Sequence, residues 1–352
     1  MNYISKSTSM PKNTAKKIVT IGGGTGSYML LSGLKKLPNV ELSAIVPSTD
    51  SGGSSGRLRD EFGFLPPGDI RQCLVALAED DEEQYLLRNI FSYRFDKGED
   101  GLKGHTFGNL FLTVLTEVIG DELKAIEKAE KLLNIKGHVY PVTLDKTVLC
   151  AKYSNGSIIE SEHNIDEPSY PHDGRLRIQE LYLKPKANTY QKVKNAIIDS
   201  DAIVIGPGDL YTSILANLVV KGVKDTILKT NAKIFYVLNL VTKFGQTWGY
   251  SANDHINEIA KYMGRYPDYV IINDNSLPKE ILKKYLEQND NVVIDDTNQY
   301  PKLLKKVKII KNDFLARETI KTQKGDKLVR SLIRHNSDKL AKTIYEQLNS
   351  KN

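Results

Sequence analysis

The sequence of 352 residues contains only two cysteines, Cys73 and Cys150. Two cysteines cannot form a disulfide framework, and without a C-x-x-C pair there is no sign of a structural zinc site or a redox dithiol. No run approaches the ~20 apolar residues of a membrane-spanning helix. The polar first 17 residues lack the apolar segment of a secretory signal. These absences predict a cytoplasmic protein that needs no membrane partner.

The chain also carries little net charge. The net charge is +6, with 26% charged and 40% hydrophobic residues, which is ordinary for a globular protein. This small excess is spread along the chain, so it does not indicate a nucleic-acid partner. It is compatible with a phosphate-bearing small ligand or with solubility alone. The apolar helices described below would allow a homodimer.

The order of the predicted elements indicates an α/β fold. The segment KIVTIGGG is a short β-branched strand that runs into glycines, SYMLLSGLKKL has helical spacing, and VELSAIV is a second buried strand. The same strand–turn–helix theme returns in NAIIDSDAIVIGPGDLYTSILANLVV. We therefore expect a Rossmann-like, doubly wound and mostly parallel sheet. Residues 1–15 should form a disordered tail and 16–352 a single domain, with a β-rich insertion at about 138–185.

The first candidate site is the turn Gly22-Gly23-Gly24-Thr25-Gly26 after the first strand. Glycines between a strand and a helix allow backbone N–H groups to approach a phosphate at the helix N-terminus. The third glycine of the dinucleotide fingerprint is replaced by Ser27, and the lysine of a P-loop is missing. The turn thus predicts an anion site without naming the ligand, and a merely tight turn is the alternative.

The second candidate site is the stretch STDSGGSSGRLR, which we expect to be a loop after the second strand and one wall of a ligand cleft. Asp50 stands where a Rossmann enzyme places its ribose-binding acid, so it is predicted to bind a ribose hydroxyl or a metal. A turn-forming aspartate is the alternative. The residues that follow offer close backbone approach, hydroxyl donors and a phosphate-binding guanidinium: Gly52, Gly53, Ser54, Ser55 and Arg57.

Two further segments place polar side chains at predicted helix entries, and a second glycine turn follows a later strand. In PPGDIR, Asp69 is expected as the N-cap, next to Arg71. In GHTFGN, His105 is either an acid–base group or a helix-capping histidine. The turn Gly206-Pro207-Gly208 is the second anion-binding candidate, and two such turns on one sheet suit a nucleotide-like ligand.

Together these segments resemble the YvcK family, also called gluconeogenesis-factor or CofD-like proteins. The resemblance covers roughly residues 17–350. The matching segments are GGGTG at 22–26, GGSSGRLR at 52–59, PPGDIR at 66–71, GHTFGNL at 104–110, GPGDLYTSI at 206–214, the N-x-x-T…G-x-T-x-G-Y-S-A-x-D-H run at 239–255, and RHN at 334–336.

The resemblance implies a Rossmann-like cytoplasmic protein that acts in cell shape and wall building on gluconeogenic carbon sources. Such proteins bind UDP-sugars such as UDP-GlcNAc, and the implied partner is a regulatory protein of cell-wall synthesis. The glycine turns at 22–26 and 206–208 match phosphate-side loops, and Asp50 matches the first of an Asp-Asp pair. The family's other polar positions match Arg71, Asn109, Tyr211, Thr212, Ser213, Asn217 and Asn239.

Two departures bear on the function. The second Asp of the family's D-D-G-G is Ser51 here, and its G-E-T-D-G is GQTWG at 245–249. A site poorer in acids favours a nucleotide-sugar-binding regulator that needs no cofactor. The alternative is a CofD-like 2-phospholactate transferase that uses a GDP-linked donor and Mg²⁺, with Asp50 as a metal ligand. A nicotinamide oxidoreductase is disfavoured, although loops that bind diphosphates would accept UDP-sugar, GDP or NAD.

Overall fold

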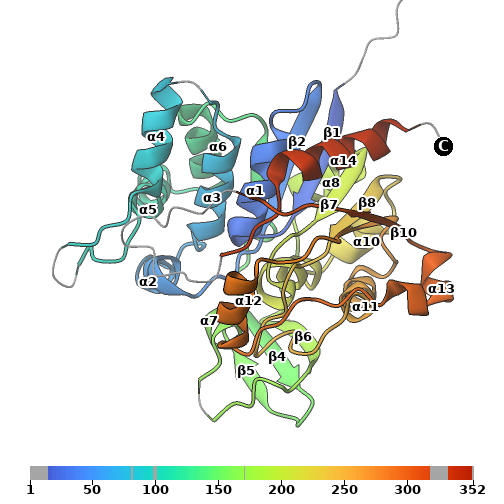
Figure 1. Ribbon diagram of the computed structural model, residues 1–352. Coiled ribbons are helices and arrows are strands. Elements are labelled where there is room, and N and C mark those ends of the chain that lie inside the picture. The colour runs from blue at the N-terminus through green and yellow to red at the C-terminus, as the bar shows by residue number, and fades with distance from the viewer. Residues whose placement is uncertain (1–14, 81, 98–100, 170, 318–331, 351–352) are drawn as a thin grey trace, which may run out of the picture.

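Seven parallel strands form the central sheet of the protein, in the order β10-β9-β8-β7-β1-β2-β3 (Figure 1). The computed structural model describes residues 15–80, 82–97, 101–169, 171–317 and 332–350. The expected α/β fold with a mostly parallel sheet is confirmed. The strands are β1 (Lys16–Ile21), β2 (Val40–Val46), β3 (His138–Pro141), β7 (Ala202–Ile205), β8 (Lys233–Val237), β9 (Tyr269–Asn273) and β10 (Lys308–Asn312).

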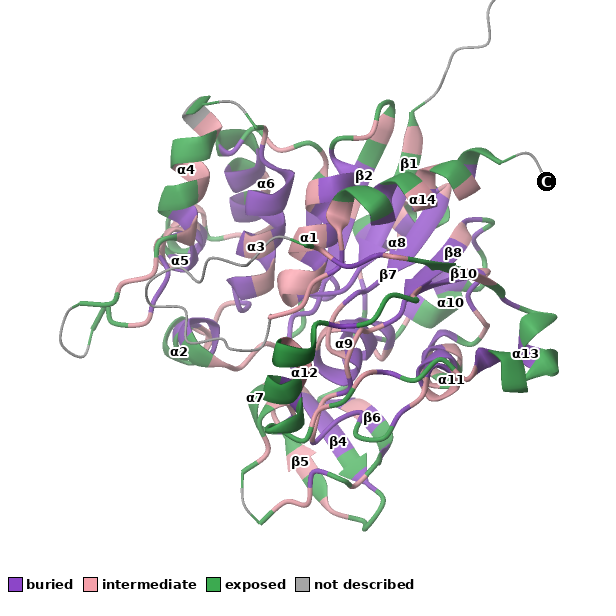
Figure 2. Ribbon diagram, viewed as in Figure 1, coloured by how far each residue is buried: buried purple, intermediate pink, exposed green. Residues whose placement is uncertain are grey.

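Both faces of this sheet are covered, because successive side chains of a strand point to opposite faces. In β1, Ile18 belongs to the apolar cluster on one face and Val19 to the cluster on the other. Buried side chains of this kind stabilise the fold by about 1.5–3 kcal/mol each. Figure 2 shows the resulting buried strands between partly exposed helices. This double covering explains why the strands read as continuous apolar runs.

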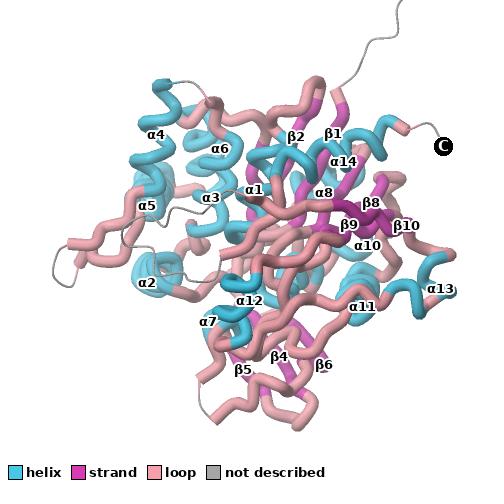
Figure 3. The backbone as a smooth tube through the Cα atoms, viewed as in Figure 1, coloured by secondary structure: helices cyan, strands magenta, loops and turns pink. Residues whose placement is uncertain are grey.

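The helices form two layers (Figure 3). The Ile18 face is covered by α1 (Gly24–Leu34), α3 (Gly68–Leu77), α4 (Glu82–Ser92), α5 (Phe107–Ile119), α6 (Glu122–Leu132) and α14 (Ser337–Asn349). The Val19 face is covered by α8 (Gln191–Ile198), the π-helical turn η1 (Leu210–Leu215), α9 (Ala216–Leu218), α10 (Val223–Ile227) and α11 (Ala252–Met263). Between β9 and β10 lie α12 (Lys279–Leu286), the 3₁₀ turn η2 (Thr297–Gln299) and α13 (Pro301–Leu304).

A smaller antiparallel sheet is inserted after β3 and lies at the lower end of the molecule in Figure 1. Its elements are β4 (Val148–Tyr153), β5 (Ile158–Glu160), α7 (Glu162–Asp166) and β6 (Ile178–Lys184). The turn at Asn155-Gly156 joins β4 and β5, as its sequence indicates. Strand β3, which the sequence places inside the insertion, pairs with β2 and forms the edge of the main sheet. The separate sheet therefore begins at Val148.

The stretch around residue 53 is helical rather than a loop: α2 (Gly53–Phe62) begins inside it. Its small residues are needed for packing. A Cβ on Gly68, at the start of α3, would lie 2.3 Å from Ser55 Oγ and 2.8 Å from Asp50 Oδ2. The starts of α2 and α3 thus approach more closely than larger side chains allow. Composition predicts a loop here, and tertiary packing overrides it.

The sequence also predicts a disordered N-terminal tail and no membrane-spanning helix. The predicted tail, residues 1–15, lies outside the described residues except for Ala15. Across the described ranges, no helix has the length and apolar character to cross a lipid bilayer.

Candidate functional site

The strand order reverses between β1 and β7. From β1 the chain proceeds outward through β2 to β3, and from β7 it proceeds in the opposite direction through β8 and β9 to β10. The loops that leave the carboxyl ends of β1 and β7 therefore diverge and leave a crevice between them. Both of these loops are glycine turns, so the two predicted anion-binding turns lie next to each other.

The two turns are in direct backbone contact. A Cβ on Gly26 would lie 2.0 Å from the carbonyl oxygen of Pro207, a distance that no side chain permits. Gly206 has a φ of +71°, in the left-handed region that favours glycine. Glycine at these two positions allows the first turn of α1 to lie against the loop that follows β7.

A cleft of about 510 Å³ opens beside this contact. Six segments contribute most of its lining: the turn after β1, the inserted sheet's α7 and following loop, the turn after β7, the loop after β8, the end of α12 with the residues that follow it, and the segment before α14. Its principal polar and glycine lining residues are Gly23, Gly24, Thr25, Gly26, Asp166, His172, Gly208, Asp209, Ser213, Asn239, Thr242, Lys243, Asp290, Arg334 and His335. The volume is within the range of about 300–1,000 Å³ that is typical of small-molecule sites.

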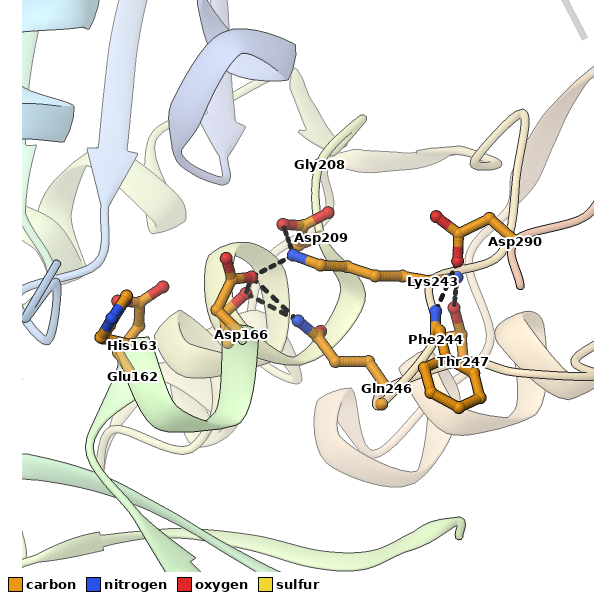
Figure 4. A network of polar contacts seen from close by, with 12 residues as sticks. Glu162, His163, Asp166, Gly208, Asp209, Lys243, Phe244, Gln246, Thr247 and Asp290 are labelled. Atoms are coloured by element: carbon orange, nitrogen blue, oxygen red, sulfur yellow. Dashed lines mark hydrogen bonds and ion pairs between the residues drawn. The ribbon is translucent and has the colours of Figure 1, made fainter. Parts of the chain in front are cut away.

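Lys243 is the centre of a charge network on one wall of the cleft (Figure 4). Its ammonium group pairs with Asp166 of α7 and, at 2.6 Å, with Asp209 of the turn after β7. Gln246 donates a hydrogen bond to the same Asp166 oxygen at 3.0 Å. Burial alone would lower the pKa of Lys243, but the carboxylates of Asp209 and Asp166 outweigh burial and hold the pKa above its ordinary value. The network ties the inserted sheet to the parallel sheet.

Three buried polar atoms that have no hydrogen-bond partner in the structure belong to residues lining the cleft: Asn239 Oδ1, His172 Nε2 and His335 Nε2. Burial lowers the pKa of His172, and it lowers that of His335 to about 4. Both imidazoles are therefore neutral near pH 7. Buried polar groups are seldom left without a partner, so these atoms are candidates for contacts to a ligand.

Two carboxylates lie behind the first glycine turn. Asp69 Oδ1 accepts a hydrogen bond from Gly24 N at 2.6 Å, and Asp50 Oδ1 accepts one from Gly52 N at 2.9 Å. Burial raises the pKa of Asp50. Burial and the charge of Asp50 raise the pKa of Asp69 to about 7. The N-cap of α3 is Pro67, so Asp69 is not the expected cap; it serves the first turn of α1 instead.

The acidic residues around the first glycine turn bear on whether the site could hold a metal ion. Within the described ranges, no three Asp, Glu, His or Cys side chains converge in a way that could hold a metal ion. Mg²⁺ commonly uses only one or two protein carboxylates together with phosphate oxygens and water. Asp50 and Asp69 fit that smaller requirement, because burial raises the pKa of both carboxyls, the charge of Asp50 adds to the rise at Asp69, and a cation would offset this charge.

Comparison with known proteins identifies the family. The family model described as 2-phospho-L-lactate transferase CofD matches residues 18–315. The chain therefore belongs to the CofD family. It is 37% identical over 334 residues to the gluconeogenesis factor of Bacillus subtilis, covering 94% of this chain and 98% of that protein. It is 36% identical over 349 residues to the gluconeogenesis factor of Listeria innocua, covering 97% and 99% of the two chains.

A crystal structure of a member of the UPF0052 family from Bacillus halodurans is similar throughout. The TM-score is 0.83 at 34% identity, and the match covers 95% of this chain and 99% of that one. The inserted antiparallel sheet is thus part of an architecture that this CofD-family chain shares with a solved relative.

The predicted residues of this CofD-family chain divide into three groups. Those that line the cleft are Gly23, Gly24, Thr25, Gly26, Pro207, Gly208, Ser213 and Asn239. Close behind them, Gly22 packs against Gly206: a Cβ on Gly22 would lie 3.9 Å from the Cα of Gly206. Thr212 donates a hydrogen bond to Asp166 at 3.3 Å. The cleft therefore takes its predicted residues mainly from the two glycine turns.

A second group forms a buried network between α2, α3 and α5. Arg71 Nε donates to Asn109 Oδ1 at 2.9 Å, and Asn109 Nδ2 donates to Ser54 Oγ at 3.0 Å and to Ser55 Oγ at 3.5 Å. His105 Nδ1 lies 3.0 Å from Ser54 Oγ, and burial lowers the pKa of this histidine. Three separate sequence segments are thus joined, but as a support for the Asp50 segment rather than as part of the cleft.

The remaining predicted residues have other contacts. Arg57 is exposed and donates to Lys103 O at 2.9 Å, and Gly53 begins α2 with a φ of +46°. The buried Tyr211 hydroxyl lies 2.8 Å from that of Tyr250. Asn217 donates to Ser213 O at 2.8 Å, which links α9 to η1. None of these four residues lines the cleft.

Sequence reasoning missed Lys243, Asp166, His172 and Asp290 as residues of the cleft. Lys243 lies inside a segment that carries the family resemblance, and its position after β8 was the available signal. Asp290 accepts a hydrogen bond from Phe244 N at 2.5 Å, and burial raises its pKa to about 6. Asp166 and His172 belong to the inserted sheet, whose position over the cleft no local pattern indicates.

Proposed function

We propose that this chain is a cytoplasmic regulatory protein that binds a nucleoside-diphosphate sugar of the UDP-GlcNAc type in the cleft. Its role is in cell shape and wall synthesis during growth on gluconeogenic carbon sources, through contact with a regulatory protein of cell-wall synthesis. The observation that carries the ligand proposal is the contact between the two glycine turns at the reversal point of the sheet. The proposed role during growth on gluconeogenic carbon sources is supported by the name of the relatives, gluconeogenesis factor.

The chemistry of the cleft supports binding more than catalysis. Its lysine is held by two carboxylates, and its two histidines are neutral near pH 7. Apart from Glu167, Asp290 and Arg334, its remaining polar surface consists of backbone, hydroxyl and amide groups. Such groups recognise a diphosphate, a sugar and a base by hydrogen bonds. A ligand that binds one conformation preferentially can then alter the affinity for a partner.

Thermal unfolding with UDP-GlcNAc, GDP and NAD, each with and without Mg²⁺, tests this proposal. UDP-GlcNAc at 100 times its Kd should stabilise the fold by ~2.7 kcal/mol without added metal. His172→Phe should weaken binding by about 5–10-fold, because Nε2 loses its ligand contact while the ring is kept. His138→Phe on β3, outside the cleft, is the matched control. If UDP-GlcNAc gives no shift in the wild-type protein, the ligand proposal is wrong.

A second candidate function is a phospholactate-type transferase that acts on a GDP-linked donor. It is favoured by one observation, the Asp50–Asp69 pair behind the turn of Gly24. These carboxylates would hold Mg²⁺, which when bound would neutralise diphosphate charge. The chain's own contribution would be to position the diphosphate between the two glycine turns and to keep water out of the cleft. A shift seen only with GDP and Mg²⁺ together, and lost in Asp50→Asn, would favour this function.

A further inference from the structure

Lys243 lies beside the second glycine turn. Its ammonium group is 2.6 Å from Asp209, the residue that directly follows Gly208, and Figure 4 shows this pair next to the turn. Both glycine turns and Lys243 line the same cleft. In a P-loop, a lysine that follows the glycines reaches the phosphates, and the first glycine turn lacks one. Lys243, which comes from the loop after β8, supplies a lysine to this cleft from a different part of the chain.

The two carboxylates that pair with Lys243 are held to different degrees. Asp166 is nearly buried, and it also accepts hydrogen bonds from Gln246 at 3.0 Å and from Thr212 at 3.3 Å. The side chain of Asp209 is 40% exposed. Asp209 stands directly before η1, but its side chain makes no capping hydrogen bond to that turn. Asp166 is therefore fixed by several donors, whereas Asp209 can rotate toward solvent once its ion pair with Lys243 is broken.

The charge of this group disfavours the simple addition of an anion. Two carboxylates and one ammonium group leave a net charge of −1. A diphosphate placed beside the intact pairs would bring further negative charge into a poorly solvated position, which is costly. An exchange avoids this cost. If a phosphate oxygen takes the place of the Asp209 carboxylate, Lys243 keeps two anionic partners and the displaced carboxylate returns to water.

We infer that Lys243 binds a phosphate of the ligand, and that the Asp209 carboxylate occupies this phosphate position in the free protein. Carboxylates and phosphates both accept charge-assisted hydrogen bonds from an ammonium group, so a position that suits one suits the other. The inference rests on the proposed function, from which it takes the diphosphate ligand, and it adds the residue that binds this diphosphate and the residue that competes with it.

Calorimetric titration of the full chain with UDP-GlcNAc and with inorganic pyrophosphate, both without metal, tests the inference. Asp209→Asn should raise the affinity for both ligands about tenfold, because the ligand no longer displaces a charged hydrogen-bond partner. Asp173→Asn is the matched control. Asp173 pairs with Arg175 in the loop that follows α7 and does not line the cleft, so both affinities should stay within about twofold of wild type.

A triple variant separates the exchange from general charge repulsion. Lys243→Met/Asp166→Asn/Asp209→Asn leaves this group with a net charge of zero, as Asp209→Asn alone does, but without the ammonium group. The affinity for pyrophosphate should therefore fall back to the wild-type value or below it. Melting curves establish that the variants are folded, and Lys243→Gln replaces Lys243→Met if the triple variant is not.

The two ligands distinguish a failure of this inference from a failure of the proposed function. If the wild-type protein does not bind UDP-GlcNAc, the proposed function is wrong, but a tenfold gain for pyrophosphate in Asp209→Asn would still support the role of Lys243. Equal affinities of the wild-type protein and Asp209→Asn, for whichever ligand binds, would overturn the inference. A gain that persists in the triple variant, or no binding of either ligand to either protein, would overturn it as well.

Discussion

Replacing Asp69 by asparagine should stabilise the protein at neutral and alkaline pH. Asp69 is held behind the first glycine turn, where burial and the charge of Asp50 raise its pKa to about 7. In Asp69→Asn, the amide oxygen can still accept the 2.6 Å hydrogen bond from Gly24 N. The substitution thus removes the charge and its repulsion while it keeps the contact between α3 and α1.

The size and sign of the effect follow from proton linkage. The ordinary pKa of 3.8 is the reference for the unfolded chain. Because the folded-state pKa is higher, the folded protein binds more protons between pH 4 and 7, and stability falls as pH rises through this window. A rise of about three pKa units corresponds to at most ~4 kcal/mol, fully felt above pH 7. Allowing for relaxation of the coupled pair, we expect Asp69→Asn to gain ~1–3 kcal/mol at pH 8.

Urea unfolding followed by circular dichroism between pH 4 and 8 measures this difference. The wild-type and Asp69→Asn curves should converge near pH 4 and separate as pH rises. Asp313→Asn is the control of opposite sign, because hydrogen bonds, first that to Lys339, lower the pKa of Asp313 to about 2. Its carboxylate stabilises the fold above pH 4 and loses this effect as pH falls toward 2. If Asp69→Asn shows no gain at pH 8, the charge repulsion inferred at this turn is refuted.

Two further substitutions test the walls of the cleft. Gly26→Ala should destabilise the fold by ~2 kcal/mol or more and abolish the thermal shift by UDP-GlcNAc, because its Cβ would lie 2.0 Å from Pro207 O. Ser32→Ala in the same helix is the control for a melting experiment, and equal melting temperatures would contradict the close contact. Lys243→Met should cost ~3–5 kcal/mol, because two carboxylates lose their cation. The double variant Lys243→Met/Asp166→Asn should recover part of this loss in urea unfolding; no recovery would speak against the ion pair.

The fold and the glycine turns were predictable because their signals are local. A β-branched run that ends in glycine and continues with helical spacing, as around Gly22 and again around Gly206, specifies a parallel strand, a turn and a covering helix. The meeting of the two turns follows from topology, since β1 and β7 are neighbours at the reversal point. These parts of the site needed no knowledge of distant contacts.

The rest of the cleft depends on contacts that local patterns do not encode. Lys243 and Asp166 are 77 positions apart, and nothing in either segment indicates that the two side chains pair. The helix at Ser54 and Ser55 was missed for the opposite reason. Its glycines and serines are typical of loops, but here Gly56 allows the helix to lie against the carbonyl oxygen of Ser51, from which a Cβ would be only 2.0 Å away.

Ser51 joins the segment around Asp50 to helix α7 of the inserted sheet. Its Oγ accepts a hydrogen bond from His163 N at 2.9 Å, and its own N lies 3.3 Å from Glu162 Oε2, so it is bonded to the start of α7. Burial and the charges of Asp50 and Asp166 already raise the pKa of Glu162. The carboxylate that resembling proteins carry at position 51 would add another charge to this group and would require a cation to offset it. A hydroxyl at position 51 joins the start of α7 to this segment without adding a further negative charge to the group.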